Sequence, residues 1–324
     1  MLIAVAGASG RLGRRFLLYC RQKGLPTLAL LRSAQSAQSL PPETQYVVVG
    51  YEGSGGVHEL MKALEGVSHI VNLTGSTDTT LFEDALFEAN VVPTKALLEA
   101  TPQTIERFVH VSSIAVYGKN PGGDIMDENS PKTPYSAYGR TKLDGEVVAL
   151  SYSQKFPVVS LQPAIIYGPG FEDGFYPVLS ALKNGRMQII GDGKNRMPIV
   201  HCDDVADAIA KALTAPAPSG SCFVLTSEPV PTQNELVETA AKALNAPMPQ
   251  KKASYGLSRA ILSVSTFLSR FGGKRQTLTP EMLDQLYLDR PFTSRKALYS
   301  LGWKASIDFK TGVGQVVDEF NQKQ

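Results

Sequence analysis

Blocks of apolar and polar positions alternate along the chain, and they predict strands and helices in turn. Leu2 to Ala6 is a short apolar run typical of a strand, and helical spacing follows as far as Lys23. The same pattern predicts further strands at 27–31, 46–49, 69–73 and 107–111, and helices at 60–64, 82–100 and 136–150. Such alternation implies parallel strands joined by right-handed helical crossovers, hence an α/β fold with a doubly wound parallel sheet.

The pattern loosens after residue 170, which indicates a second lobe. A helix at 204–213 and a strand at 222–225 are expected to rejoin the sheet. We therefore predict a Rossmann-type domain over 1–170, with 204–226 returning to it, and a smaller C-terminal substrate lobe over 171–203 and 227–324. Thr232 to Glu235 has capping-box spacing, and Thr279-Pro280 is typical of a helix start.

One helix of the second lobe has an apolar stripe. Between Ala253 and Gly272, apolar residues recur at helical spacing, at Leu257, Ala260, Ile261, Val264, Leu268 and Phe271. Because such stripes usually face a core, we expect this helix to pack on its own lobe. A helix that covers the active site or meets an apolar substrate stays an alternative.

The composition of the chain favours small molecules as its binding partners. The chain has 324 residues, 43% of them hydrophobic, and a net charge of +2 without a long basic run. These values are ordinary for a soluble protein and give no electrostatic case for nucleic acid or a membrane surface. We also expect no membrane span and no targeting segment, because the longest apolar runs are short and the chain enters a strand at once.

Cysteine and histidine spacing further restricts the chemistry. Cys20, Cys202 and Cys222 form no C-x-x-C pair, so neither a disulfide framework nor a zinc site is indicated, and a reducing cytoplasm fits. The four histidines lie in separate elements without metal-ligand spacing, so we expect no metal.

A glycine turn follows the first strand. Its residues are Gly7, Ala8, Ser9, Gly10, Arg11, Leu12 and Gly13. Glycine lets a backbone approach a phosphate closely, and the following helix offers free N–H groups and the positive end of its dipole. The spacing G-x-x-G-x-x-G is longer than that of ordinary dinucleotide-binding folds, and plain packing is the alternative. The turn is thus a candidate pyrophosphate site.

Arg32 stands at the end of the second predicted strand, about twenty residues past the glycine turn, where an NAD-binding protein usually has an acidic residue. A guanidinium there can pair with the 2′-phosphate of NADP, with help from Arg11 and Ser33. A solvated surface arginine is the alternative. We therefore expect NADP as cofactor, with NAD as the second choice.

Three further residues suggest acid–base chemistry. Ser113 follows the strand at 107–111, and Tyr138 and Lys142 are four residues apart in a predicted helix. That spacing puts the phenol and the ammonium group on one face of the helix. A nearby cation favours the phenolate and would lower the tyrosine pKa from about 10. Tyr138 is then a candidate acid or base, and Ser113 a candidate holder of the reacting oxygen.

These motifs together resemble the extended branch of the short-chain dehydrogenase/reductase superfamily, which holds NAD-dependent epimerases and dehydratases and hydroxysteroid dehydrogenase-like proteins. The resemblance spans nearly the whole chain. Its marks are the glycine turn, V-S-S-x-x-V-Y-G at 111–118, Y-x-x-x-K at 138–142, Q-P-A-I-I-Y-G-P-G at 162–170, G-D-G at 191–193, V-H-C-D-D-V at 200–205 and L-G-W at 301–303.

The resemblance implies roles for these residues. Tyr138 would be the acid/base, Lys142 would hold the nicotinamide ribose and Ser113 the substrate oxygen. Cofactor contacts would also come from Leu73, Thr74, Gly75, Asn90, Pro163 and Ile166. The chain departs from the family at Gly50-Tyr51, where an Asp commonly contacts the adenine, and at Gln162, where an Arg is frequent. A homodimer through the helices at 82–100 and 136–150 is also implied.

We therefore expect an NAD(P)-dependent oxidoreductase that moves a hydride between the nicotinamide and a carbinol or carbonyl carbon. An apolar or small carbonyl substrate is slightly favoured over a nucleotide sugar. A nucleotide-sugar epimerase or dehydratase is the first alternative, and Arg196 would then meet a diphosphate. A non-catalytic NADP-binding sensor or assembly factor is the second.

Overall fold

The computed structural model describes residues 1–120, 122–272 and 280–323; the side chains of residues 173, 266–272 and 281 lie outside this description. Within it, a seven-stranded sheet has the order β10-β6-β5-β4-β1-β2-β3, and its paired strands are parallel. The strands are β1 (Ile3–Ala6), β2 (Thr27–Leu31), β3 (Tyr46–Val48), β4 (His69–Asn72), β5 (Arg107–Val111), β6 (Val158–Pro163) and β10 (Ser221–Leu225). The predicted doubly wound sheet is confirmed.

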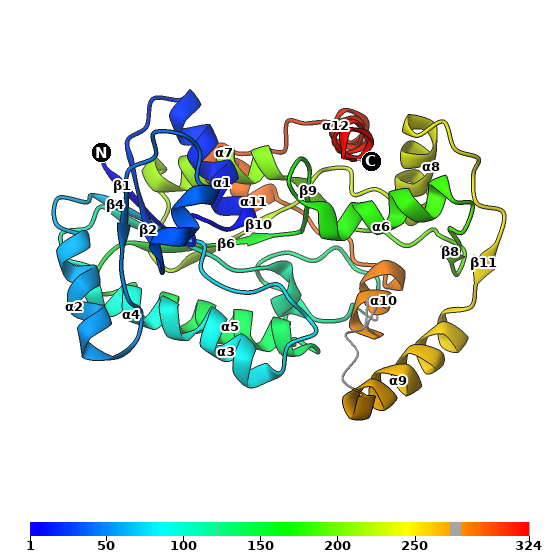
Figure 1. The fold of residues 1–324 in the computed structure, drawn as a ribbon, viewed down its shortest axis with the longest axis horizontal. Helices are drawn as coiled ribbons and strands as arrows, with labels where there is room; N and C mark the ends of the chain where they lie inside the picture. The colour runs from blue at the N-terminus through cyan, green and yellow to red at the C-terminus, as the bar shows by residue number, and fades with distance from the viewer. Residues whose placement is uncertain (121, 273–279, 324) are drawn as a thin grey trace.

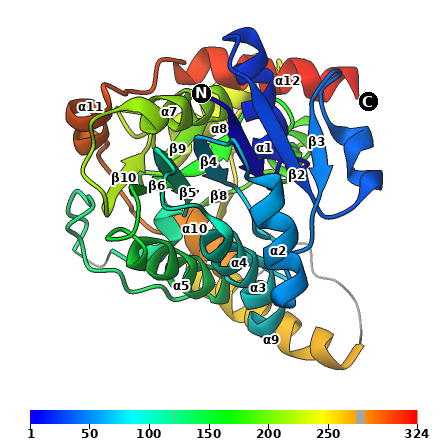
Figure 2. The same cartoon turned by 90° about the vertical axis from the view of Figure 1, so that its left-hand side faces the viewer.

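Helices cover both faces of this sheet (Figures 1 and 2). One face carries α1 (Arg11–Gln22), α7 (Cys202–Thr214) and α11 (Arg295–Leu301); the other carries α2 (Gly53–Ala63), α3 (Glu83–Asn90), α4 (Val92–Ala100) and α5 (Ala137–Ser151). Two separate apolar cores form because strand side chains alternate between the faces: Val5 packs with the first group of helices and Ala6 with the second.

The single helix predicted over 82–100 is wrong. The chain forms two helices there, α3 and α4, which meet at Val91. Pro93 lies in the first turn of α4. Proline has no N–H to donate to a preceding turn, so it is accommodated at a helix start and ends the helix before it.

The remaining elements form a third apolar core beside the sheet. This core is built by β7 (Ile165–Tyr167), β9 (Ile199–His201), α6 (Glu172–Lys183), α8 (Gln233–Ala243) and α12 (Phe309–Gln322), with β8 (Ile189–Ile190) pairing with β11 (Lys252–Ala253). The predicted capping box at the start of α8 is confirmed, because Thr232 and Glu235 bond each other's backbone. Pro280 begins α10 (Pro280–Tyr287), while Thr279 lies outside the described residues.

The domain division stays a prediction. In its favour, β10 joins the sheet beside β6. However, Trp303 is fully buried and donates a hydrogen bond from Nε1 to the carbonyl of Asp204 in α7 at 2.9 Å. Together with α11, this part of the expected substrate lobe packs against the sheet's own helices.

The predicted amphipathic helix is α9 (Tyr255–Gly272), but its stripe does not pack on the lobe. Leu257, Ile261 and Val264 are 65%, 59% and 60% exposed, while the side chains of Leu268 and Phe271 lie outside the described residues. Ala260 is exposed as well, so the expectation of a core-facing stripe is wrong for all four of its described side chains. None of the described helices is both long enough and apolar enough to cross a bilayer.

Candidate active site

The glycine turn lies where the strand order reverses. β1 is flanked by β4 and β2, and the ends of β1 and β4 meet at Gly7 and Leu73. Gly7 has φ +76°, and a Cβ on it would lie 2.5 Å from the backbone of Leu73. Only glycine fits both conditions. This crevice beyond the carboxyl ends of the strands is where such sheets bind ligands.

The start of α1 can receive a phosphate. Gly10 caps this helix and offers no side-chain hydrogen bond, so the first N–H groups of α1 are not satisfied by a cap. Gly13 packs so closely on the turn that a Cβ would lie 2.3 Å from the carbonyl oxygen of Gly7. Ser9 and Leu12 complete this uncapped turn, which fits the pyrophosphate of a dinucleotide.

Ser113 and Tyr138 meet at the same rim. Ser113 follows the end of β5 and caps the 3₁₀ helix η2 (Ile114–Tyr117), where its Oγ accepts a hydrogen bond from the N–H of Ala115 at 3.1 Å. Tyr138 lies in the first turn of α5 and forms a hydrogen bond with Ser113. Gly139 allows this approach, because a Cβ there would lie 2.7 Å from the carbonyl oxygen of Ala115.

Lys142 lies one turn further along α5, as its spacing predicts, but it does not lower the pKa of Tyr138 as expected. Its Nζ donates to the carbonyl of Val111 at 2.6 Å, and burial lowers its pKa to about 8, against a smaller opposite effect of Glu146. Burial raises the pKa of Tyr138, and the hydrogen bond with Ser113 only partly offsets this. The expected fall in the Tyr138 pKa is thus not found, because desolvation of the phenolate dominates.

Asn90 connects the segment after β4 to helix α5 by hydrogen bonds. It is buried at the end of α3, where its Oδ1 accepts from the N–H of Ser76 at 2.7 Å and its Nδ2 donates to Thr141 at 2.9 Å. The preceding residues of the rim, Leu73, Thr74 and Gly75, follow β4 directly, and Asn72 accepts two hydrogen bonds from Thr74. Asn90 therefore holds the 73–76 segment against α5, between Tyr138 and Lys142.

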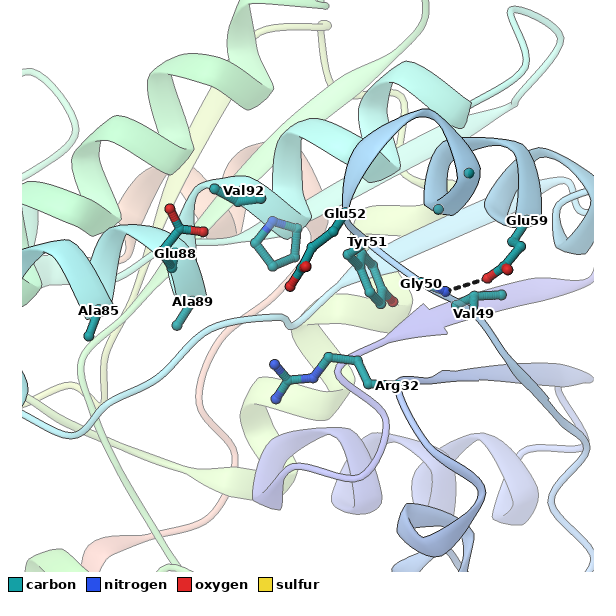
Figure 3. A pocket seen from close by; sticks show the side chains of 13 residues that line it. Arg32, Val49, Gly50, Tyr51, Glu52, Glu59, Ala85, Glu88, Ala89 and Val92 are labelled. Carbon is teal, nitrogen blue, oxygen red and sulfur yellow. Dashed lines mark hydrogen bonds between the residues drawn. The ribbon is translucent and has the colours of Figure 1, made fainter.

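A cavity of about 560 Å³ opens beside the ends of β2 and β3. Figure 3 shows Arg32 and Tyr51 across this cavity from Ala85, Glu88 and Ala89 of α3. The volume falls within the range of small-molecule sites. Acidic residues, Glu52, Glu59 and Glu88, also line it, so Arg32 is not its only charged group.

The two residues expected to assist Arg32 have other contacts. Arg11 donates to the hydroxyl of Thr77 at 3.2 Å and lies 5.5 Å from the ring centroid of Phe171, while the hydroxyl of Ser33 pairs with Ser36. The structure thus directs Arg11 towards the lobe that begins after residue 170 rather than towards Arg32.

Pro163 ends β6, and Ile166 lies half-buried in β7, so both lie on the segment that leaves the sheet. Gln162, just before them, accepts from the hydroxyl of Tyr117 at 2.6 Å and donates to Glu146 at 2.8 Å. Gln162, which stands where the family frequently has an arginine, therefore holds together a buried hydrogen-bond network.

Arg290 is a buried cation near Ser113 that the sequence did not indicate. Only 5% exposed, it donates from Nη2 to the carbonyl of Ile114 at 2.9 Å, and among the described residues its Nε has no hydrogen-bond partner. Arg196, in contrast, is paired with Asp289 at 2.5 Å. An isolated arginine in a loosely patterned lobe gives no signal, so only the fold reveals that Arg290 reaches Ser113's neighbour.

His201, Cys202 and Asp203 are the one group among the described residues whose ligand atoms lie close enough for a metal, within 4.8 Å. Their contacts argue against that use. Asp203 pairs with Arg15, and the Nδ1 of His201 accepts from the N–H of Asp203 at 3.2 Å. Burial raises the pKa of the Cys202 thiol to about 12, so the thiolate that binds metal is disfavoured. We propose no metal there.

The fold and this rim define a dinucleotide-dependent enzyme class, and sequence comparison agrees. Residues 3–225 match the model of the NAD dependent epimerase/dehydratase family, and the chain belongs to this family. The resemblance to the extended short-chain dehydrogenases/reductases is thereby confirmed. Members of the family are enzymes.

The relatives act on varied molecules. The chain is 24% identical over 80% of its length to N-acetyl-alpha-D-glucosaminyl-diphospho-ditrans,octacis-undecaprenol 4-epimerase of Escherichia coli O157:H7, covering 79% of that protein. It is 25% identical to 2-alkyl-3-oxoalkanoate reductase of Stenotrophomonas maltophilia (strain K279a), with 97% of both chains covered.

A solved structure with the same fold was determined with NAD bound. It is MoeE5 in complex with UDP-glucuronic acid and NAD, with a TM-score of 0.77, 21% identity and both chains fully covered. At this identity the likeness shows the fold alone.

Proposed function

We propose that this chain transfers a hydride between a nicotinamide dinucleotide and a carbinol or carbonyl carbon, with Tyr138 as the acid/base. The single observation that carries the proposal is the hydrogen bond between Ser113 and Tyr138, one helical turn from Lys142. This group lies at the same sheet edge as the glycine turn, so a dinucleotide held there would place its reactive ring beside the phenol.

Each residue has a distinct task in this proposal. The nicotinamide, when bound, accepts or returns the hydride. In oxidation, Tyr138 takes the hydroxyl proton at Oη while Ser113 holds the same oxygen by a hydrogen bond. In reduction, Tyr138 returns that proton to the forming alkoxide. Lys142, as a cation, holds the ribose; Gly7, Gly10 and the start of α1 hold the pyrophosphate.

The protonation of Tyr138 favours a proton-donating role for this residue. Burial raises the pKa of this phenol, so its protonated form is favoured at neutral pH. That form suits the reductive direction, in which the phenol donates. A carbonyl substrate is therefore our first choice, in line with the slight preference for an apolar or small carbonyl compound.

We further propose NADP as the preferred dinucleotide. Support comes from Arg32, an exposed guanidinium at the end of β2 that lines the 560 Å³ cavity. A 2′-phosphate on the ribose would accept from it. Arg11 no longer contributes to this proposal, since its contacts are with Thr77 and Phe171.

A nucleotide-sugar epimerase or dehydratase is the second candidate. One observation favours it: the buried guanidinium of Arg290, beside Ile114, has an Nε without a partner among the described residues. A diphosphate is the kind of anion that an arginine binds in a buried position. Arg196 gives no such support, because Asp289 already pairs with it.

We also propose a homodimer and a reducing compartment such as the cytoplasm. The exposed apolar side chains of Phe87 on α3 and Val147 on α5 support contact between copies, since these helices lie side by side. The three cysteines are buried free thiols, which suits a reducing environment.

The test compares Tyr138→Phe with the unchanged protein. Dinucleotide affinity and single-turnover hydride transfer are measured with a panel of ketones and nucleotide sugars. Retained binding with hydride transfer reduced by at least about a hundredfold supports the proposal. If no compound reacts with either protein while the dinucleotide still binds, the non-catalytic NADP-binding sensor is the better account.

A further inference from the structure

Helix α9 turns its apolar side outward. Leu257, Ile261 and Val264 are spaced i, i+4 and i+7, so they lie along one face, and each is at least 59% exposed. The opposite face carries Tyr255, Arg259 and other half-buried residues. A water-exposed helix normally has the reverse arrangement, with its apolar face inward.

The inward face is held in place by polar contacts. Asp284 of α10, 1% exposed, accepts from the hydroxyl of Tyr255 at 2.8 Å and from the Nε of Arg259 at 2.8 Å. Tyr255 also stacks on Tyr287, with ring centroids 3.9 Å apart and 7° between the planes. These hydrogen bonds and the ring stacking fix the orientation of α9, so its apolar face points outward.

Figures 1 and 2 both show α9 at the margin of the molecule, projecting beyond α10. Asp284 lies 3.5 Å from Lys119 as well, two residues after η2. This links the base of α9 to the segment that leads away from Ser113. The displayed face thus lies on the side of the molecule that carries the substrate lobe.

The charge of the surrounding sequence is strongly asymmetric. Residues 239–280 contain seven Lys and Arg residues and no Asp or Glu. Two of the seven are paired with acidic residues outside this segment, Lys242 with Glu238 and Arg259 with Asp284. Lys251 and Lys252, just before α9, are exposed. The whole-chain charge of +2 conceals this local excess, which is why it gave no electrostatic case for a membrane surface.

We propose that α9 docks this protein onto an anionic phospholipid bilayer, with Leu257, Ile261 and Val264 inserted among the acyl chains. An outward apolar stripe with basic flanks is the arrangement that lies in the plane of a membrane interface. Anionic headgroups attract the lysines, and the acyl region takes the apolar side chains. A helix of this kind need not be long enough to span the bilayer.

A second copy of the chain fits this face less well. A symmetric contact through α9 would bring the same basic segment of each copy together, and like charges repel. The bilayer surface supplies the opposite charge, so charge complementarity selects it. The proposal is independent of the reaction at Tyr138.

The test uses the full chain and sedimentation with vesicles. One set contains phosphatidylglycerol and phosphatidylcholine in equal parts, the other phosphatidylcholine alone. We expect co-sedimentation with the anionic vesicles only, weakened by salt. The triple variant Leu257→Ser, Ile261→Ser, Val264→Ser should reduce the partition coefficient by roughly tenfold or more, and Lys251→Glu with Lys252→Glu by a similar factor.

Matched controls alter exposed residues elsewhere. Met61→Ser with Tyr299→Ser removes two apolar side chains that are 53% and 79% exposed, and Lys62→Glu with Lys304→Glu changes charge by the same amount. Neither should alter vesicle binding. Ile261→Trp adds a reporter that tolerates folding differences: its fluorescence should shift to the blue with anionic vesicles.

Two results would overturn the proposal. One is equal sedimentation of the unchanged protein with both kinds of vesicle, or with neither. The other is a triple variant that loses self-association in analytical ultracentrifugation without vesicles, while vesicle binding is unaffected; this would assign the face to a second copy.

Discussion

Lys142 donates a hydrogen bond from its Nζ to the carbonyl of Val111 at 2.6 Å, and so joins helix α5 to the end of β5. The bond thus connects the helix that carries Tyr138 to the strand that Ser113 follows. It also buries the amine, since Lys142 is only 7% exposed. The residue proposed to hold the ribose is thus a structural link as well.

Because the Lys142 amine is buried, we predict that the free energy of unfolding depends on pH. Lys142 loses its proton near pH 8 in the folded chain and near its ordinary 10.5 in the unfolded one, so the unfolded state binds more protons between these values. Stability must then rise with pH in that window, and its gain is lost as the pH falls through about 8. Relative to Lys142→Met, the unchanged protein should gain about 2 kcal/mol between pH 7 and pH 10.

Urea unfolding at several pH values measures this difference. Lys95→Met is the control, because Lys95 is an exposed lysine, and its difference from the unchanged protein should stay nearly flat. A flat difference for Lys142→Met as well would show that the amine is not desolvated in the folded state.

We predict that replacing Gly139 by alanine lowers turnover without weakening cofactor binding. In Gly139→Ala, the new Cβ would lie 2.7 Å from the carbonyl oxygen of Ala115, so η2 and α5 must move apart. The Ser113–Tyr138 hydrogen bond would lengthen, and we expect kcat to fall by roughly a hundredfold, as for a misplacement of about 1 Å. Steady-state kinetics and dinucleotide titration separate the two effects.

Gly174→Ala provides the control, since Gly174 also lies in a helix and a Cβ added there would meet no heavy atom within 4 Å. It should leave kcat unchanged. Should Gly139→Ala weaken dinucleotide binding as much as it lowers kcat, the contact would serve the cofactor site rather than the acid–base pair.

We predict that Arg32 determines the preference for NADPH over NADH. If its guanidinium pairs with a 2′-phosphate, Arg32→Asp should weaken NADPH binding by roughly tenfold or more, about 1.4 kcal/mol, while NADH binding stays the same or improves. Isothermal titration with both dinucleotides gives the ratio. Arg21→Asp makes the same change of charge outside the cavity and should alter neither affinity. Equal affinities before and after the change at Arg32 would refute the role.

Local pattern predicted most of the sheet. The strands at Thr27–Leu31 and Arg107–Val111 were predicted to the residue, because apolar residues form the majority of both short runs. The spacing of Tyr138 and Lys142 likewise placed both on one helix. These predictions succeed where residues close in sequence determine the structure.

Features that depend on distant contacts could not be predicted. Nothing near Gly139 shows that the Ala115 carbonyl packs on it, and nothing near Arg290 shows that it reaches Ile114, 176 residues away. The spacing of apolar residues predicted helix α9, but this spacing alone does not show which face of the helix packs inward. The hydrogen bonds of Tyr255 and Arg259 to Asp284 determine that face. The expected effect of Lys142 on Tyr138 failed because burial is a property of the whole fold.

We predict that the stability of the fold depends strongly on the ion pair between the buried Glu146 and the partly exposed Lys132. This carboxylate is fully buried in α5 and accepts hydrogen bonds from Lys132 at 2.5 Å, from Ser160 at 2.8 Å and from Gln162 at 2.8 Å. Lys132→Met would leave a buried charge without its cation, and we expect a loss of about 3 kcal/mol in the free energy of unfolding. The exposed pair Lys242–Glu238 is the control, where Lys242→Met should cost at most about 0.5 kcal/mol. Adding Glu146→Gln to Lys132→Met should restore part of the loss, because a neutral amide needs no cation. A double variant no more stable than Lys132→Met would mean that Lys132 acts through packing and not through charge.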